Sequence, residues 1–172
     1  LARYRRGIPL SQYATMMREW DGFGSGDGVY DHVLRDLPRD TKIFRKMKQG
    51  DEYPAAHRVA TALFEAEASK SGLSFDSNDW KDLHRKMVPP YPVHSFPNRW
   101  WKLNENGPSR TLMAHIGKDT YSHIHYDRDQ ARVITPREAA RLQSFPDGFI
   151  FEGPMNPAFK QIGNAVPPVM AN

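Results

Sequence analysis

Hydroxyl and cationic side chains gather between residues 109 and 121, in the run Pro-Ser-Arg-Thr-Leu-Met-Ala-His-Ile-Gly-Lys-Asp-Thr-Tyr that begins at position 108. Guanidinium, ammonium and hydroxyl groups are the usual protein contacts to phosphate and sugar oxygens of nucleic acids. The side chains that fit this chemistry are those of Ser109, Arg110, Thr111, Lys118 and Tyr121. His123 and His125 alternate just beyond them, which raises a metal site as an alternative. The absence of cysteine and of an acidic ligand at helical spacing nearby argues against metal.

A complete helix start lies at Thr135. Thr135 can cap the helix, Pro136 occupies its first position, and Glu138 can reach back to the cap amide. The pattern predicts a helix over about residues 136–144, which must end before a Phe-Pro step. Arg137 and Arg141 lie four positions apart and therefore share a face. From local physics alone, this is a well-capped helix with two solvated arginines.

A Gly-Asn step precedes two prolines near the C-terminus, in the run Gln-Ile-Gly-Asn-Ala-Val-Pro-Pro that ends at position 168. Gly163 permits a close backbone approach. The prolines favour a helix start, and amides at a helix N-terminus suit a carboxylate. The run is therefore either an anion-binding loop or an ordinary turn from loop to helix.

The runs 132–147 and 160–168 resemble the last two sequence motifs of the cytosine-5 DNA methyltransferases. The run 108–125 is similar to a segment of one large bacterial branch of that family. This chain departs from the branch at Thr120, where the branch has glycine, and at Tyr126, where it has proline. The resemblance is strong over about residues 96–172 and weak before them.

The resemblance implies the C-terminal portion of a bacterial methyltransferase of a restriction-modification system. Residues 1–131 would form the target recognition domain, with strands at about 99–125, and residues 132–172 would hold the final motifs. These motifs comprise a recognition-lobe helix at about 136–144 and a cofactor-pocket loop at 160–168. Residues within about 30–97 would read base edges in the major groove, although the sequence does not single them out.

Site residues follow from the same resemblance. Contacts to double-stranded DNA are expected from Ser109, Arg110, Thr111, Lys118, Tyr121, Arg137 and Arg141, and Arg137 would also organise the recognition lobe. The pocket for S-adenosylmethionine would be lined by Gly163, Asn164, Ala165 and Val166. Family members often have serine at the position of Ala165, so here only the backbone amide could serve.

The chemistry of the family needs residues that this chain lacks. A cysteine thiolate attacks cytosine in that family, and this chain has no cysteine. A Gly-rich cofactor loop, a Pro-Cys motif and a Glu-Asn-Val motif are also missing from the sequence. We therefore expect no catalytic residue here, and a partner that is either an absent N-terminal catalytic lobe or a separate catalytic subunit.

Alternatives to the fragment interpretation remain. The chain could be the non-catalytic recognition subunit of a split methyltransferase, or a free-standing DNA-binding module or remnant. The start at Leu1 favours an excised fragment. No stretch approaches the ~20 apolar residues of a membrane span, and the N-terminus lacks the apolar core of a signal peptide. These features predict a cytoplasmic protein with no membrane partner.

A net charge of +4 permits nucleic-acid binding without demanding it. Basic residues cluster locally, and each cluster is about equally well explained as a solvated helix face. The clusters are Arg3/Arg5/Arg6, Lys42/Arg45/Lys46/Lys48 and Lys81/Arg85/Lys86.

The periodicity of the chain predicts an α+β fold. Helices are expected at about 11–20, 29–37, 39–49, 55–70 and 78–87, and short strands at 99–103, 110–116 and 121–125. The fold would thus have a helical front half, a small β-sheet and a C-terminal segment that belongs to an absent Rossmann-like lobe. The Gly-rich run 21–28 is a poor phosphate cradle, because it lacks the Lys-Ser/Thr of a P-loop and no apolar strand precedes it.

Overall fold

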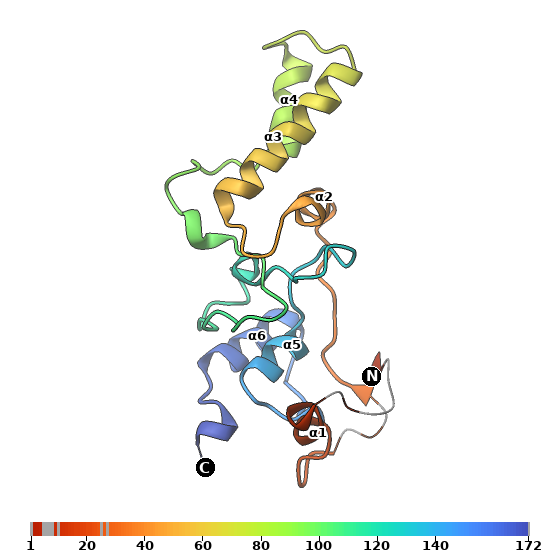
Figure 1. Cartoon of the computed structure of the whole chain (residues 1–172), viewed down its shortest axis with the longest axis vertical. Helices are drawn as coiled ribbons and strands as arrows, with labels where there is room; N and C mark the ends of the chain where they lie inside the picture. Colours follow the sequence, from red (N-terminus) through yellow and green to blue (C-terminus); the bar gives the residue numbers. More distant parts are fainter. Residues whose placement is uncertain (1, 5–8, 10, 25, 27, 172) are drawn as a thin grey trace. The chain divides into compact units, whose positions relative to one another are not determined.

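The computed structural model describes residues 2–4, 9, 11–24, 26 and 28–171 of the chain (Figure 1). The chain divides into two compact units, each assembled from separated stretches of sequence. Unit 1 comprises residues 1–35, 110–120 and 134–172, and unit 2 comprises residues 36–109 and 121–133. Among the described residues, no helix is long and apolar enough to cross a membrane.

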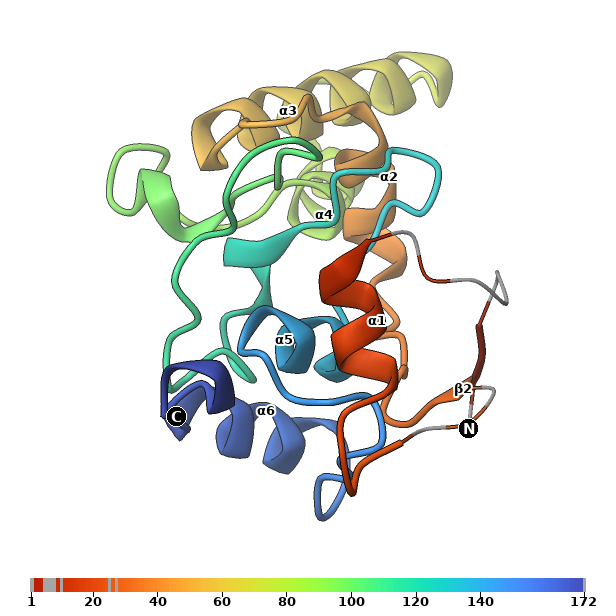
Figure 2. The same cartoon turned by 60° about the horizontal axis from the view of Figure 1, so that its bottom comes forward.

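Unit 1 holds short helices and one small antiparallel sheet. Strand β1 (Ala2–Arg3) pairs with β2 (Gly28–Val29), so that residue 2 lies opposite residue 29. The helices are α1 (Gln12–Arg18), α5 (Pro136–Leu142) and α6 (Met155–Asn164), and α5 packs against α6 (Figure 2). A 3-10 turn, η3 (Pro168–Met170), follows.

The expected helix start at Thr135 is confirmed. The Thr135 hydroxyl accepts from the Glu138 amide at 3.2 Å, and the Glu138 carboxylate accepts from the Thr135 amide at 2.8 Å. This reciprocal pair satisfies two amides that the first turn leaves without an intrahelical partner. The cap fixes where α5 begins and therefore which residues face the interior.

Arg137 is the buried centre of unit 1, with 1% of its surface exposed. Its Nε donates to the Tyr30 carbonyl at 2.9 Å and its Nη1 to the Pro146 carbonyl at 2.8 Å. Nη2 donates to the Phe149 carbonyl and lies 3.3 Å from an Asp31 carboxylate oxygen. The guanidinium thus joins α5 to two loops, one more than 100 residues before it in sequence. Burial lowers the pKa of Arg137, and the Asp31 carboxylate opposes that shift.

The next turn of α5 carries a second internal ion pair. Arg141 donates from Nε and Nη2 to the two carboxylate oxygens of Asp147, at 2.7 and 2.5 Å. Asp147 is fully buried, and it also accepts from the Tyr4 hydroxyl at 2.7 Å. Charge-assisted bidentate pairs of this kind fix orientation as well as adding stability. The α5 face of Arg137 and Arg141 therefore holds the unit together.

Gly163 brings the loop 113–117 against α6. A Cβ at this position would lie 2.6 Å from the Met113 carbonyl oxygen and 3.0 Å from the Ala114 Cα. Gly117 meets α6 in the same way, since its Cβ would lie 3.2 Å from that of Phe159. The expected close approach at Gly163 is confirmed, and the backbone that approaches it belongs to this chain.

Unit 2 is mainly helical. Its elements are α2 (Pro38–Lys46), α3 (Tyr53–Lys70), α4 (Asn78–Met87) and the 3-10 turn η1 (Pro97–Arg99); a second turn, η2 (Thr120–His123), crosses the sequence boundary between the units. Helices α3 and α4 pack as a hairpin around Phe64, whose ring lies 4.9 Å from that of Trp80. The rest of the core combines aliphatic and aromatic side chains, and the Trp100 ring lies 4.6 Å from that of Tyr121 and 5.6 Å from that of Phe44.

Two expectations about elements were wrong. Residues 29–37 form no helix: the stretch begins in β2, Asp31 has a φ of 60°, and Pro38 disfavours helical backbone just before it. Within 99–125, the described chain has single-residue bridges instead of strands, joining Glu52 to Trp101 and Lys102 to Ile124. The stretch 110–116 is irregular because it packs on α6 instead of pairing with a strand.

The other helices agree with the sequence patterns. The helices expected at 11–20, 55–70, 78–87 and 136–144 appear as α1, α3, α4 and α5, within about two residues at most ends. The helix expected at 39–49 is α2, which ends earlier because Met47 is extended. In the Gly-rich run 21–28, residues 25 and 27 lie outside the described residues, as do Arg5 and Arg6 of the first basic cluster.

The buried position of Arg137 predicts a large loss of stability in Arg137→Met. Methionine fills similar space but leaves three carbonyls and the Asp31 carboxylate without their donor, which we expect to cost about 3–5 kcal/mol. Urea unfolding followed by circular dichroism measures this loss. Lys160→Met on the exposed side of α6 is the control and should change stability by less than about 0.5 kcal/mol. Equal stability of the two variants would contradict the organising role of Arg137.

Gly163→Ala sets two effects against each other. Alanine favours a helix over glycine by about 1 kcal/mol, whereas forcing a methyl group into a packed backbone contact costs about 1–3 kcal/mol. Because the obstructing atoms are backbone, we expect net destabilisation and faster hydrogen exchange of the amides near Ile116. Gly24→Ala is the matched control, since a Cβ there meets nothing within 4 Å. A stabilised Gly163→Ala protein would show that the loop yields easily.

Candidate nucleic-acid interface

The structure does not gather the expected DNA contacts of the run 109–121 into one unit. Ser109 and Tyr121 belong to unit 2, whereas Arg110, Thr111 and Lys118 belong to unit 1. Thr111 and Lys118 are exposed, and Ser109 and Arg110 are half-buried. The side chains of Thr111 and Lys118 are therefore accessible, as a contact to the DNA backbone requires.

Tyr121 serves the interior of unit 2. Its hydroxyl donates to an Asp40 carboxylate oxygen at 2.6 Å, and its ring packs against Trp100 and Phe44. Burial raises the pKa of Tyr121, and the hydrogen bond to Asp40 adds to that rise. Arg39 lies on the same carboxylate, 2.5 Å from its other oxygen. The Tyr121 hydroxyl is therefore committed to the core.

Arg137 and Arg141 are likewise engaged inside unit 1. The expectation of a DNA contact at Arg137 does not fit its burial, because its donors all end on internal oxygens. Its expected organising role does fit. Arg141 keeps 34% of its side chain exposed, but its Nε and Nη2 both donate to Asp147. Local sequence patterns show that two arginines share a face, but they do not show that the face is buried.

The expected cofactor-pocket loop at 160–168 needs correction. Residues 160–164 form the last part of α6, the backbone becomes extended at Ala165, and η3 starts at Pro168. The Ala165 amide donates to the Ile162 carbonyl at 3.3 Å, and the backbone of residues 113–114 packs directly against Gly163. Asn164 and Val166 are exposed, the latter by 68%. These two side chains could form part of a wall for a small molecule.

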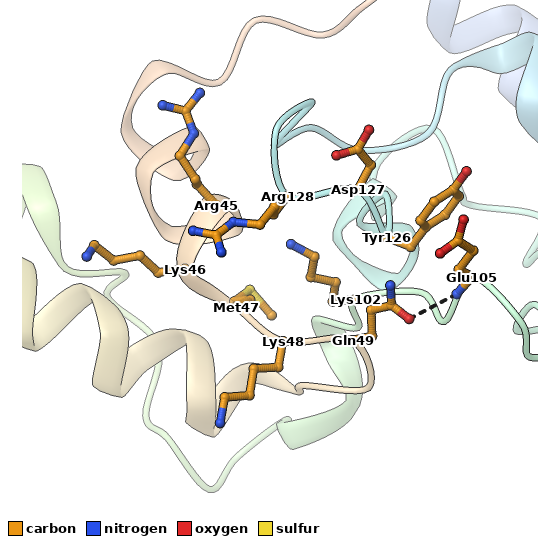
Figure 3. Close-up of a pocket in the computed structure, with 10 residues that line it drawn as sticks. All are labelled: Arg45, Lys46, Met47, Lys48, Gln49, Lys102, Glu105, Tyr126, Asp127 and Arg128. Atoms are coloured by element: carbon orange, nitrogen blue, oxygen red, sulfur yellow. Dashed lines mark hydrogen bonds between the residues drawn. The ribbon is translucent and has the colours of Figure 1, made fainter.

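A cationic pocket of about 650 Å³ lies in unit 2 (Figure 3). It forms where the end of α2 meets the loops around Lys102 and Arg128. Five cations and two carboxylates line it: Arg45, Lys46, Lys48, Lys102 and Arg128, with Glu105 and Asp127. In Figure 3, the carboxylates are drawn on the far side of Lys102 from Lys46. The pocket has the charge required to hold an anion.

Backbone hydrogen bonds position the pocket walls. The Lys48 amide donates to an Asp51 carboxylate oxygen at 2.7 Å, which closes a turn after α2. The Gly50 amide donates to the Lys102 carbonyl at 2.8 Å, and the Lys102 amide donates to the Asp51 carbonyl at 3.0 Å. The Gln49 side chain accepts from the Glu105 amide at 3.1 Å. The basic turn is thus anchored to the segment that carries Lys102.

The sequence marked this pocket only in part. The cluster Lys42/Arg45/Lys46/Lys48 was visible as a run of charge, with a solvated helix face as an equal explanation. Lys102 and Arg128 were not singled out, because both lie more than 50 residues further along the chain. The pairing of residues 50–52 with 101–102, and of 102 with 124, helps to bring them together.

Comparison with known proteins shows the family of the chain. The family model of the C-5 cytosine-specific DNA methylases matches residues 28–172. A type II methyltransferase of Bacillus paralicheniformis is 47% identical over 163 residues, covering 94% of this chain and 31% of the relative. A relative from Oceanobacillus iheyensis is 47% identical over 146 residues, with shares of 84% and 31%. A DNA (cytosine-5-)-methyltransferase of Aeropyrum pernix is 40% identical over 210 aligned residues, with shares of 96% and 44%.

These matches run through most of this chain but only part of each relative. The chain spans about a third of the length of the first two relatives. The family match includes unit 2 with its pocket and the part of unit 1 from residue 28 onward, with the capped helix α5 and the end of α6. The chain belongs to the C-5 cytosine-specific DNA methylase family.

Proposed function

We propose that this chain is the DNA-recognition portion of a cytosine-5 DNA methyltransferase that uses S-adenosylmethionine. Unit 2 would contact duplex DNA, and the end of α6 would supply one wall of the cofactor pocket. The observation that carries the proposal is the cationic pocket, which the fold assembles from three separate segments in a chain of this family. Residues Thr111 and Lys118, both exposed, are candidate backbone contacts in unit 1.

The residues near the end of α6 fit part of a cofactor site. Asn164 offers an exposed amide group, and Val166 offers an exposed apolar surface. When bound, the cofactor supplies the methyl group of the reaction. In this chain, Asn164 would hydrogen-bond a polar end of the cofactor and Val166 would cover an apolar part. Gly163 and the Ala165 amide are engaged within the chain and would act by shaping the backbone.

The residues for the chemical step lie outside this chain in our proposal. The sequence has no cysteine, so the thiolate that adds to cytosine must come from another stretch of protein. Recognition and chemistry would therefore be divided, with this chain binding and orienting the duplex. The second stretch would be the N-terminal lobe of one polypeptide or a separate subunit.

We expect the chain alone to bind duplex DNA in a salt-dependent manner and to transfer no methyl group. Each phosphate neutralised should add about −0.9 to the slope of log K against log salt concentration. Fluorescence anisotropy between 50 and 200 mM salt measures the slope, and a labelled-cofactor filter assay measures transfer. A salt-independent affinity, or robust methylation by the isolated chain, would contradict the proposal.

A chimera tests the cofactor wall. Replacing the matching third of the Bacillus paralicheniformis relative by this chain should yield an active methyltransferase. In that chimera, Asn164→Ala should raise KM for S-adenosylmethionine about tenfold, the effect of one lost hydrogen bond of about 1.4 kcal/mol, and leave DNA affinity unchanged. Asn106→Ala, which changes an exposed asparagine of unit 2, is the matched control. An unchanged KM in the Asn164 variant would remove this residue from the cofactor site.

A separate experiment decides between a fragment and a split enzyme. The isolated chain is mixed with a protein that carries the Pro-Cys and Glu-Asn-Val motifs, without covalent linkage. Methylation in the mixture would favour the split recognition subunit. Activity confined to the fused chimera would favour one continuous enzyme. DNA binding without activity in either arrangement would favour a free-standing binding module.

A further inference from the structure

We infer that the cationic pocket of unit 2 binds a backbone phosphodiester of duplex DNA. Arg45, Lys48 and Arg128 would contact the phosphate oxygens, and Lys102 would supply a fixed positive charge at the floor. The inference rests on the proposed function and assigns it a set of residues that none of the sequence motifs contains. It shifts the main phosphate contact from the run 109–121 to the end of α2.

Lys102 is built into the fold beneath the exposed cations. Only 1% of its surface is exposed, and its Nζ donates to the Phe44 carbonyl at 2.6 Å. Phe44 lies in the last turn of α2, where carbonyls lack an intrahelical donor. The amide four residues later, that of Lys48, donates to Asp51 instead. Lys102 therefore caps α2 and neutralises the negative end of its dipole.

The position of Lys102 suits an anion in the pocket. An ammonium group has three N–H donors, so the bond to Phe44 uses one of them. Burial lowers the pKa of Lys102, and the positive charge of Arg128 lowers it further. A bound phosphate would oppose both effects and stabilise the charged ammonium. An anion in the pocket would therefore stabilise the charged form of Lys102 more than that of a freely solvated lysine.

The carboxylate of Asp127 is turned into its own loop. One oxygen accepts from the Asp129 amide at 2.8 Å, and the other accepts from the Gln130 side chain at 3.0 Å. These hydrogen bonds lower the pKa of Asp127, so the carboxylate stays charged and the loop stays closed. The acidic residue therefore builds the turn that presents Arg128 and offsets only part of the positive charge.

The exposed cations of the pocket differ from those of α4. On α4 and the turn before it, Lys81 pairs with Asp76 at 3.1 Å and Arg85 pairs with Asp82. Among the described residues, the side chains of Arg45, Lys48 and Arg128 form no ion pair. Both groups look alike as sequence, but Lys81 and Arg85 are paired with carboxylates, whereas Arg45, Lys48 and Arg128 are not among the ion pairs of the described residues. Its volume of about 650 Å³ accommodates a stretch of backbone more readily than a single small ion.

The test compares two double variants of the full chain by fluorescence anisotropy on duplex DNA. We expect Arg45→Gln/Arg128→Gln to reduce the slope of log K against log salt concentration by about 1.8, because two phosphate contacts are lost. For each lost contact, the loss of affinity should be roughly eightfold larger at 0.1 M than at 1 M salt. The loss should be equal for duplexes of different sequence, as for phosphate contacts. Lys81→Gln/Arg85→Gln removes the same formal charge from unit 2 and should leave the slope unchanged. A single variant, Lys48→Gln, should reduce the slope by about 0.9 and guards against misfolding of the double variant.

The outcomes separate this inference from the proposed function. If the unaltered chain binds DNA and both pocket variants bind equally well, the pocket assignment is overturned and DNA recognition stands. A loss confined to one DNA sequence would also overturn it, because that indicates base reading. If the unaltered chain binds no duplex, both fail.

Nuclear magnetic resonance distinguishes DNA from free phosphate as the source of the anion. We expect both duplex DNA and millimolar inorganic phosphate to shift the amide signals of residues 46–49 and 127–129. Shifts with inorganic phosphate alone would show a site for the free ion and overturn the DNA assignment.

Discussion

The buried guanidinium of Arg137 is the constraint on which unit 1 depends. Removing this charge from water is costly, and the cost is offset only because its donors reach the carbonyls of Tyr30, Pro146 and Phe149 and the Asp31 carboxylate. Those acceptors lie in loops that make no regular sheet or helix there. The rings of Phe145, Phe149 and Phe151 pack together in the second of these loops, and the guanidinium adds directed hydrogen bonds to its backbone.

Unit 2 also contains a buried cation that donates to a backbone carbonyl, Lys102, but this residue lies beside an open pocket. Lys102 donates to the end of α2 as Arg137 donates to its loops, and both are about 1% exposed. The surroundings differ in kind. Arg137 is enclosed by carbonyl and aromatic groups, whereas Lys102 lines a pocket with four further cations. The first arrangement stabilises a fold, and the second stabilises a fold while keeping positive charge available to a ligand.

Local signals in the sequence predicted local structure well. The Thr135 cap, the length of α4 and the close approach at Gly163 all follow from residue types within a few positions of each other. What the sequence could not supply was the partner of each group. Periodicity identified the shared face of Arg137 and Arg141 but not its burial. Tyr121 was expected to contact DNA because its hydrogen-bond acceptor, Asp40, lies 81 residues away and local sequence does not reveal it. The pocket was only half visible for the same reason: Lys102 and Arg128 join α2 through long-range pairing.

The cations that hold the fold and the exposed cations of the pocket differ in what their replacement would remove. The cations committed to the fold donate to backbone carbonyls and internal carboxylates, so their replacement removes several bonds at once. Of the exposed cations, Arg45 lies in the last turn of α2, whereas Lys48 and Arg128 lie on a turn and a loop whose shapes are held by Asp51 and Asp127. Replacing an exposed side chain leaves those turns intact and costs little stability. A protein built this way can change the positive charge of this surface without losing its structure, because Asp51 and Asp127 hold the turns through hydrogen bonds that do not involve the exposed cations.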